Sequence, residues 1–247
     1  MIKDKYLPYF LPVRAFIFFL VFIESAFYVG HGMQAVSNWW SIVASAVNIV
    51  TIVMLVLLAK GAGKSYAELI NYKKGKKSAV RYLLIPLGII VIGMAGMYLA
   101  GLICYGTILP KAALEVIAPM PPVLAVINMA VLPLTVPFAE DGLYLGCGVN
   151  CIGNKYAAVL VPAFFYAFQH CFIPTLFDAR YMLYRFLSFL PLTIMLCWYY
   201  RKKRDPVPIM IGHAVLDAAT ASMILMTSVI PGFYEEMCSM AAGTVVQ

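Results

Sequence analysis

Long apolar stretches, each about as long as a membrane-spanning helix, fill most of this 247-residue sequence. A helix that crosses the hydrocarbon core of a bilayer needs about 20 mainly apolar residues. Seven stretches meet this requirement, at residues 11–30, 40–59, 83–106, 123–146, 156–173, 181–200 and 207–230. The pattern therefore predicts an all-α, polytopic membrane bundle with about seven transmembrane helices, folded as a single domain over residues 1–247.

The composition agrees with a membrane protein and argues against a soluble one. Hydrophobic residues make up 63% of the chain and charged residues 12%, whereas a soluble domain is nearer half apolar and a quarter charged. So few polar residues cannot cover a core of that size, and much of the surface must face lipid. The six cysteines form neither CxxC pairs nor zinc-finger spacing.

The basic residues are divided unevenly between the two predicted ends of the bundle. The chain has 18 Lys and Arg against 11 Asp and Glu, which gives a net charge of +7. With seven spans, all of these cations except Lys111, Arg180 and Arg185 fall on the side of the N-terminal segment and the even-numbered loops. The positive-inside rule then predicts a cytoplasmic N-terminus. We expect the basic loops to contact membrane lipids, and we expect no nucleic-acid partner.

Six ionisable residues lie in or near the predicted spans, where a charge costs about 3 kcal/mol or more. They are Glu24, Glu140, Asp141, His170, His213 and Asp217. Such residues usually face the interior of a bundle and serve a function. They predict a polar site inside the bundle, although a separate polar contact or a position near the lipid interface explains Glu24 better.

The spacing within each span indicates how these groups could work. His213 and Asp217 lie at i and i+4, on one face of one helix, so the carboxylate could orient the imidazole. Glu140 and Asp141 are neighbours, which point about 100° apart in an α-helix. We therefore expect one of them at the reactive centre and the other supporting it from behind. A structural alternative is that these are polar pairs that hold helices together or reach toward the interface.

The fifth predicted span carries the segment Tyr166-Ala-Phe-Gln-His170, with the phenol one turn from the imidazole. A lone histidine on an apolar helix is commonly a hydrogen-bonded core residue. Counting about 1.5 Å per residue also places His170 roughly 10 Å deeper in the membrane than Glu140 and His213. Its role in a common site therefore depends on how the helices are tilted or broken.

Taken in order, the three motifs resemble those of the CPBP family, which comprises CAAX prenyl endopeptidases and bacterial membrane proteases that process bacteriocins. The family motifs are Glu-Glu-xxx-Arg, Phe-xxx-His and His-xxx-Asn/Asp, and the resemblance covers about residues 123–230. This chain departs from them at three positions: Asp141 replaces the second glutamate, Leu145 replaces the arginine, and Tyr166 replaces the phenylalanine. Asp217 is an accepted variant.

The resemblance implies hydrolysis of a peptide bond within the membrane. Glu140 would activate a water molecule and His170 would help to hold it. His213 and Asp217 would orient the scissile carbonyl group or stabilise the oxyanion, with Asp141 and Tyr166 in support. The substrate would be a hydrophobic or lipid-modified peptide, and the location a bacterial cell membrane.

We expect no tightly bound cofactor, because no HExxH-type motif is present. If a zinc ion takes part, Glu140, His170 and His213 would be its ligands.

Two other functions remain open at this stage. A catalytically relaxed immunity or scaffold protein could keep the bundle, and the departures at Asp141 and Leu145 favour it. A proton-coupled transporter also buries carboxylates and histidines, although the sequence has no internal repeat typical of transporter folds.

Overall fold

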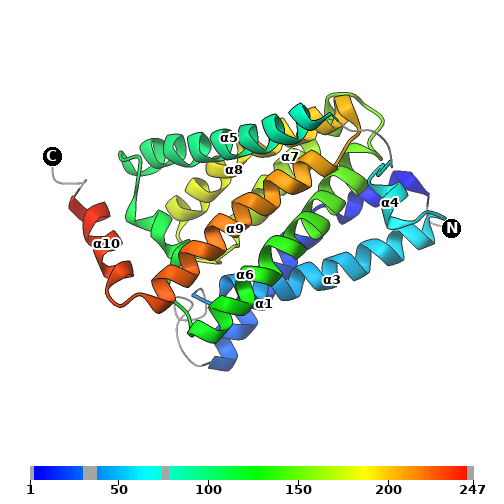
Figure 1. The fold of residues 1–247 in the computed structure, drawn as a ribbon. Coiled ribbons are helices and arrows are strands. Elements are labelled where there is room, and N and C mark those ends of the chain that lie inside the picture. The colour runs from blue at the N-terminus through cyan, green and yellow to red at the C-terminus, as the bar shows by residue number, and fades with distance from the viewer. Residues whose placement is uncertain (1–2, 30–37, 74–77, 244–247) are drawn as a thin grey trace.

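The computed structural model describes residues 3–29, 38–73 and 78–243, and these residues fold into a helical bundle (Figure 1). The elements in chain order are η1 (Asp4–Phe10), α1 (Val13–Val29), α3 (Trp40–Gly61), α4 (Tyr66–Leu69), α5 (Ala79–Tyr105), η2 (Lys111–Ile117), α6 (Pro122–Val136), η3 (Pro137–Val149), α7 (Ala157–Phe168), η4 (Gln169–Cys171), α8 (Ala179–Lys203), α9 (Val207–Val229) and α10 (Phe233–Gly243). The described residues form no β-sheet, which confirms the all-α prediction.

Six helices in the described part of the chain are long and apolar enough to cross a membrane. They correspond to six of the seven expected spans, with α6 and η3 forming one continuous segment, Pro122–Val149. The remaining expected span, at residues 156–173, is a shorter apolar helix that runs from Ala157 to Cys171. The polytopic bundle is confirmed, whereas the count of seven spans and the cytoplasmic N-terminus stay predictions.

The long helices run side by side, and the N-terminus and C-terminus lie at opposite ends of the bundle (Figure 1). Helix α9 packs on α5 and α6, α5 packs on α8, and α8 packs on α7. On the other side, α6 packs on α3, and α3 contacts α1. The segment η3 touches α3, α7, α8 and α9, so it occupies the centre of the bundle.

The segment η3 is a π-helix, in which each N–H bonds to the carbonyl group five residues earlier. It begins at Pro137, which has no N–H to continue the α-helical pattern of α6. The hydroxyl group of Tyr66, in α4, donates to the carbonyl oxygen of Phe138 over 2.6 Å. A Cβ atom on Gly142 would lie 2.5 Å from that hydroxyl oxygen, so only glycine lets α4 pack this closely on η3.

The far end of η3 is fixed by a group of hydrogen bonds. Asn150 donates to the carbonyl oxygen of Leu69 over 2.7 Å and to the hydroxyl oxygen of Tyr200, in α8, over 2.8 Å. Tyr200 in turn donates to the carbonyl oxygen of Ile70 over 2.8 Å. Both ends of the π-helix are therefore held by the short segment that contains α4.

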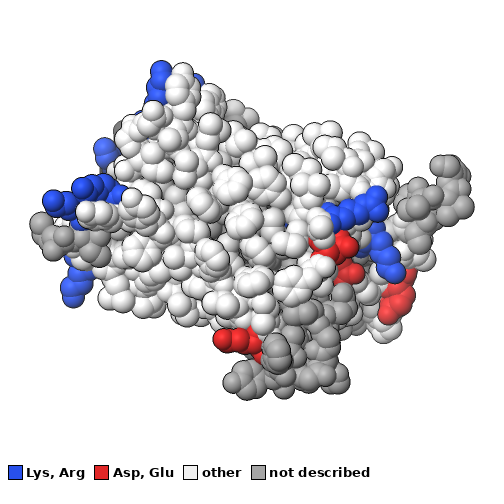
Figure 2. Space-filling model, turned by 180° about the vertical axis from the view of Figure 1, so that it is seen from behind, with Lys and Arg blue, Asp and Glu red and all other residues white. Residues whose placement is uncertain are grey.

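The charged side chains lie at the two ends of the bundle (Figure 2). In this view Lys and Arg gather at the end that carries the N-terminus and α4. Asp and Glu, with further Lys and Arg, lie toward the opposite end, one acidic group lies at the lower edge, and the broad face between these groups is uncharged. An uncharged surface of this kind suits contact with lipid acyl chains.

The packing of α5 on α8 predicts the effect of a single added methyl group. A Cβ atom on Gly96 would lie 2.4 Å from the carbonyl oxygen of Ser188, which belongs to the backbone of α8 and cannot move aside. We expect Gly96→Ala to lower the free energy of unfolding by about 1–3 kcal/mol, because the two helices must separate. Thermal unfolding of the purified protein in detergent measures this loss.

Gly88, in the same helix, is the matched control, because a Cβ atom there would meet nothing within 4 Å. Gly88→Ala should leave the melting temperature unchanged or raise it, since alanine favours a helix over glycine. Equal melting temperatures for Gly96→Ala and the unmodified protein would contradict this account of the α5–α8 contact.

Candidate active site

Five of the six ionisable residues singled out in the sequence come from three neighbouring segments. Glu140 and Asp141 lie near the start of η3, and His170 lies in η4. His213 and Asp217 lie in α9. Both carboxylates of η3 are buried, with exposed fractions of 4% and 1%, so the bundle interior has to satisfy their charge.

The imidazole of His213 lies at the centre of three carboxylates. Its Nε2 atom is 3.8 Å from Oε2 of Glu140 and 3.6 Å from Oδ2 of Asp217. Its Nδ1 atom is 3.5 Å from Oδ2 of Asp141. The structure therefore brings four of the residues singled out from the sequence together around one ring.

The two neighbouring carboxylates reach the same imidazole, which differs from the expectation that one would stand behind the other. That expectation assumed the 100° step of an α-helix. The π-helix has more residues per turn and so a smaller angle between neighbours. Glu140 and Asp141 consequently approach opposite edges of the His213 ring.

Tyr166, in α7, connects two members of this group. Its hydroxyl group donates to Oδ1 of Asp141 over 3.0 Å and lies 3.0 Å from Nδ1 of His213. The ring stacks on that of Tyr144, with 4.4 Å between centroids. The phenol thus lies within direct hydrogen-bonding distance of the site.

His170 lies beside the site rather than in it. Its Nδ1 atom is 2.9 Å from the carbonyl oxygen of Tyr166, and its ring stacks on Phe189 at 3.5 Å. The guanidinium group of Arg185 also lies over the Phe189 ring, 5.0 Å from its centroid. In the described part of the chain, the ion pairs of the site carboxylates run to His213 and Arg14 and not to His170.

The expected difference in depth explains this arrangement. Tyr166 precedes His170 by one helical turn, or about 6 Å. It is Tyr166 that reaches the level of Glu140 and His213, while His170 remains one turn further along the segment.

Arg14 is the main residue of the site that the sequence analysis did not identify. It was counted with the basic residues of one membrane side, but its side chain is fully buried. Its Nη2 atom lies 2.9 Å from Oε1 of Glu140. Nη2 also donates to Asn48 over 2.9 Å, while Nη1 donates to Thr51 over 3.0 Å and Nε donates to Gln169 over 2.8 Å.

Arg14 supplies a guanidinium group to an acidic pair whose own helix lacks one. Leu145, at the position of the motif arginine, is fully buried and carries no charge. The cation comes instead from α1, more than a hundred residues earlier in the sequence. A lone arginine at the start of an apolar span was the available signal, because such a charge requires a buried partner.

Several buried polar atoms of the site have no hydrogen-bond partner within the protein. They are Oε2 of Glu140, Oδ2 of Asp141, Oδ2 of Asp217 and Nε2 of Gln169. Buried polar groups are normally paired with protein or with water. The three carboxylate oxygens face the same imidazole at 3.5–3.8 Å, and contacts of this length commonly contain a bridging water or ligand.

The residues do not fit a zinc site. Within the described chain, no three His, Cys, Asp or Glu side chains are arranged to hold a metal ion. In the set of Glu140, His170 and His213, the ion pairs of Glu140 run to Arg14 and His213 and not to His170.

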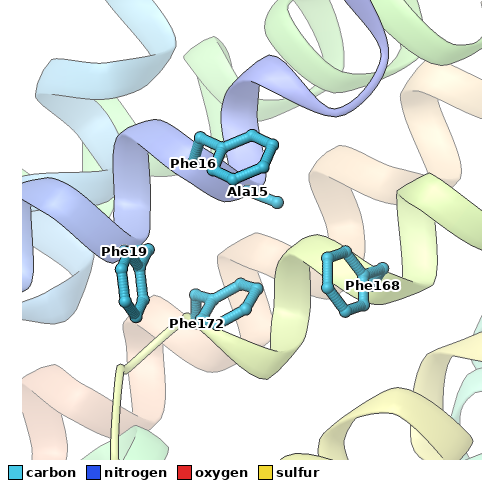
Figure 3. Close-up of a pocket in the computed structure, with 5 residues that line it drawn as sticks. All are labelled: Ala15, Phe16, Phe19, Phe168 and Phe172. Atoms are coloured by element: carbon cyan, nitrogen blue, oxygen red, sulfur yellow. The ribbon is translucent and has the colours of Figure 1, made fainter.

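An apolar pocket of about 150 Å³ lies beside the site, between α1 and the segment α7–η4 (Figure 3). Its lining consists of Ala15, Phe16, Phe19, Phe168 and Phe172. Ala15 directly follows Arg14 in the sequence and Phe168 directly precedes Gln169, and Arg14 and Gln169 are joined by a hydrogen bond. The pocket therefore lies next to the segments that carry Arg14 and Gln169.

Glu24 takes no part in the site. Its side chain is exposed on α1, which agrees with a position outside the polar group of the bundle.

Comparison with known proteins supports the interpretation of the three motifs. Residues 122–219 match the model of the Rce1-like family, described as type II CAAX prenyl endopeptidase Rce1-like. No curated protein and no solved structure matches the chain. The matched range begins with α6 and contains η3, α7, η4 and α8 together with the part of α9 that carries His213 and Asp217. Residues 122–219 of this polytopic membrane bundle are therefore similar to the Rce1-like family of type II CAAX prenyl endopeptidases.

Proposed function

We propose that this protein is an intramembrane endopeptidase that hydrolyses a peptide bond in a membrane-associated, hydrophobic or lipid-modified peptide. The observation that carries the proposal is the position of Glu140. Arg14 holds one of its carboxylate oxygens, while the other faces His213 without a hydrogen bond of its own. The match to a family of peptidases supports the same activity.

The arrangement suits activation of water by a general base. A water between Oε2 of Glu140 and Nε2 of His213 would give one proton to Glu140 as its oxygen attacks the scissile carbonyl carbon. The resulting tetrahedral oxyanion needs a hydrogen-bond donor in a site from which bulk water is excluded. Collapse of this intermediate breaks the C–N bond, and Glu140 returns the proton to the leaving amine.

His213 and Asp217 are the groups closest to the developing charge. In its protonated form His213 can donate from Nε2 to the oxyanion, and Asp217, 3.6 Å away, stabilises that form. His170 acts from a greater distance, by fixing the Tyr166 backbone and through its stack with Phe189. This role is more indirect than the one implied by the motif alone.

The pocket between α1 and α7 is an argument for a substrate with an apolar group. It is lined by apolar side chains only (Figure 3), and its lining residues Ala15 and Phe168 are the sequence neighbours of Arg14 and Gln169. A hydrocarbon chain or large apolar side chain in this pocket would place a peptide bond near the buried carboxylates.

A catalytically relaxed scaffold or immunity protein is the second candidate. The replacement of the motif arginine by Leu145 was the feature that favoured it. Arg14 provides that charge from another helix, and the ion pair with Glu140 is complete. Retention of a buried carboxylate with an unpaired oxygen favours the enzyme, because an inactive scaffold gains nothing from its desolvation cost.

Glu140→Gln tests the proposed base. The amide keeps the size of the side chain but cannot accept the proton of water, so cleavage of a hydrophobic peptide in liposomes should fall at least about a hundredfold. Glu24→Gln, an exposed change of the same kind on α1, is the control and should keep full activity. Wild-type rates for Glu140→Gln and for His213→Asn would remove the protease proposal.

Arg14 can be tested through both stability and activity. Arg14→Leu leaves Glu140 buried without its cation, which should cost about 3–5 kcal/mol of unfolding free energy. Arg14→Lys keeps the charge but loses the planar fork that contacts four partners. We expect it to be more stable than Arg14→Leu and still less active than the unmodified enzyme.

Thermal unfolding and peptide cleavage in detergent measure the two Arg14 effects. Arg81→Leu, which removes an exposed arginine at the start of α5, is the control. Arg14 would be an ordinary topology-setting charge if Arg14→Leu and Arg81→Leu had the same melting temperature.

A further inference from the structure

The hydroxyl group of Tyr166 lies between the carboxylate of Asp141 and the imidazole of His213, which are too far apart for a good direct hydrogen bond. It is 3.0 Å from Oδ1 of Asp141 and 3.0 Å from Nδ1 of His213. The direct distance between Oδ2 of Asp141 and Nδ1 of His213 is 3.5 Å, longer than an ordinary hydrogen bond. Tyr166 is 1% exposed, so water does not compete for its hydroxyl group.

A count of protons fixes the direction of these bonds. A phenol has one hydrogen to donate, and an ionised carboxylate can only accept. The hydrogen of Tyr166 therefore goes to Asp141. The phenol oxygen is left to accept, so the hydrogen of the second bond has to come from Nδ1 of His213.

We infer that Tyr166 is a positioning residue that keeps a proton on Nδ1 of His213 and so makes Nε2 the nitrogen that faces the water and the oxyanion in the reaction. This inference rests on the proposed peptidase function. Tyr166 acts through His213 and does not itself touch the substrate. Asp141 completes the chain by holding the phenol in the orientation that accepts from Nδ1.

The remaining groups around the ring agree with this division of roles. The charged groups that face His213 are Glu140 and Asp141 on η3 and Asp217 on α9 itself. Glu140 and Asp217 both approach Nε2, at 3.8 and 3.6 Å, and each has an oxygen without a hydrogen bond. Nε2 thus faces the place where water and substrate would react, while Nδ1 faces Asp141 and Tyr166.

The inference also accounts for two departures from the family motifs as one coupled change. The side chain of Asp141 is one methylene group shorter than the glutamate of the motif. Its Oδ2 atom lies 3.5 Å from Nδ1 of His213, too far for an ordinary hydrogen bond. Tyr166 carries a hydroxyl group that the phenylalanine of the motif lacks. The phenol bridges the space that the shorter acid leaves.

Nitrogen NMR of protein labelled with ¹⁵N-histidine tests the position of the proton directly. The signals of His213 are assigned by their loss in His213→Asn, which separates them from those of His170 and of His31, a residue outside the described part of the structure. We expect Nδ1 to keep the shift of a protonated nitrogen while only Nε2 changes with pH. A His213 ring that loses its proton from Nδ1 first overturns the inference.

A double-mutant cycle tests the coupling between the two departures. Tyr166→Phe removes the acceptor for Nδ1–H and should lower kcat/KM at least about tenfold, mainly through kcat. Asp141→Glu alone should also be impaired, because the longer acid and the phenol compete for one space. Together, Tyr166→Phe and Asp141→Glu should recover most of the activity, since a longer carboxylate can then accept from Nδ1 directly.

The controls separate this inference from the proposed function. Tyr181→Phe, which removes the hydroxyl group of another buried tyrosine, one that packs with Ala100 and Cys104 in a separate cluster, should keep wild-type kinetics. An inactive Glu140→Gln beside a fully active Tyr166→Phe would overturn the role of Tyr166 and leave the peptidase proposal intact. A double variant no better than the worse single variant would likewise overturn the coupling, once melting temperatures show that all variants fold.

Discussion

Three carboxylates, two of them buried and one partly buried, lie close together in a membrane bundle and constrain everything around them. Charge in hydrocarbon is costly, and a buried acid is tolerated only with a cation and hydrogen bonds. Arg14 provides the cation for Glu140, and His213 lies within 4 Å of all three acids. Helices α1, α7 and α9 therefore have to converge on η3, and the bundle can hardly rearrange without leaving one of these charges unpaired.

The π-helix is the local element that makes this convergence possible. In an α-helix the neighbours Glu140 and Asp141 would point to different sides of the bundle. The wider winding of η3 brings both to one imidazole, and the segment around α4 holds the π-helix at each end. Irregular helices of this kind are frequent at functional sites, where they place side chains that a regular helix would separate.

The departures from the family motifs are compensated in space rather than along the sequence. The arginine missing at Leu145 is replaced by Arg14 from the first helix. The short acid at Asp141 is supported by the hydroxyl group of Tyr166. A sequence motif records which residue occupies a position, whereas the chemistry depends on which atoms reach the site. This distinction explains how a chain with three substitutions in its motifs can keep an organised polar centre.

The sequence by itself determined the membrane class, the all-α bundle and the segments that carry Glu140, His170, His213 and Asp217, because apolar length and the cost of buried charge are local properties. Only the tertiary structure decided that Arg14 is buried in the site, that Tyr166 rather than His170 meets His213, and that neighbouring acids face one ring. Those outcomes depend on helix tilt, on the winding of η3 and on contacts between residues far apart in the chain. Periodicity along a single helix carries no information about them.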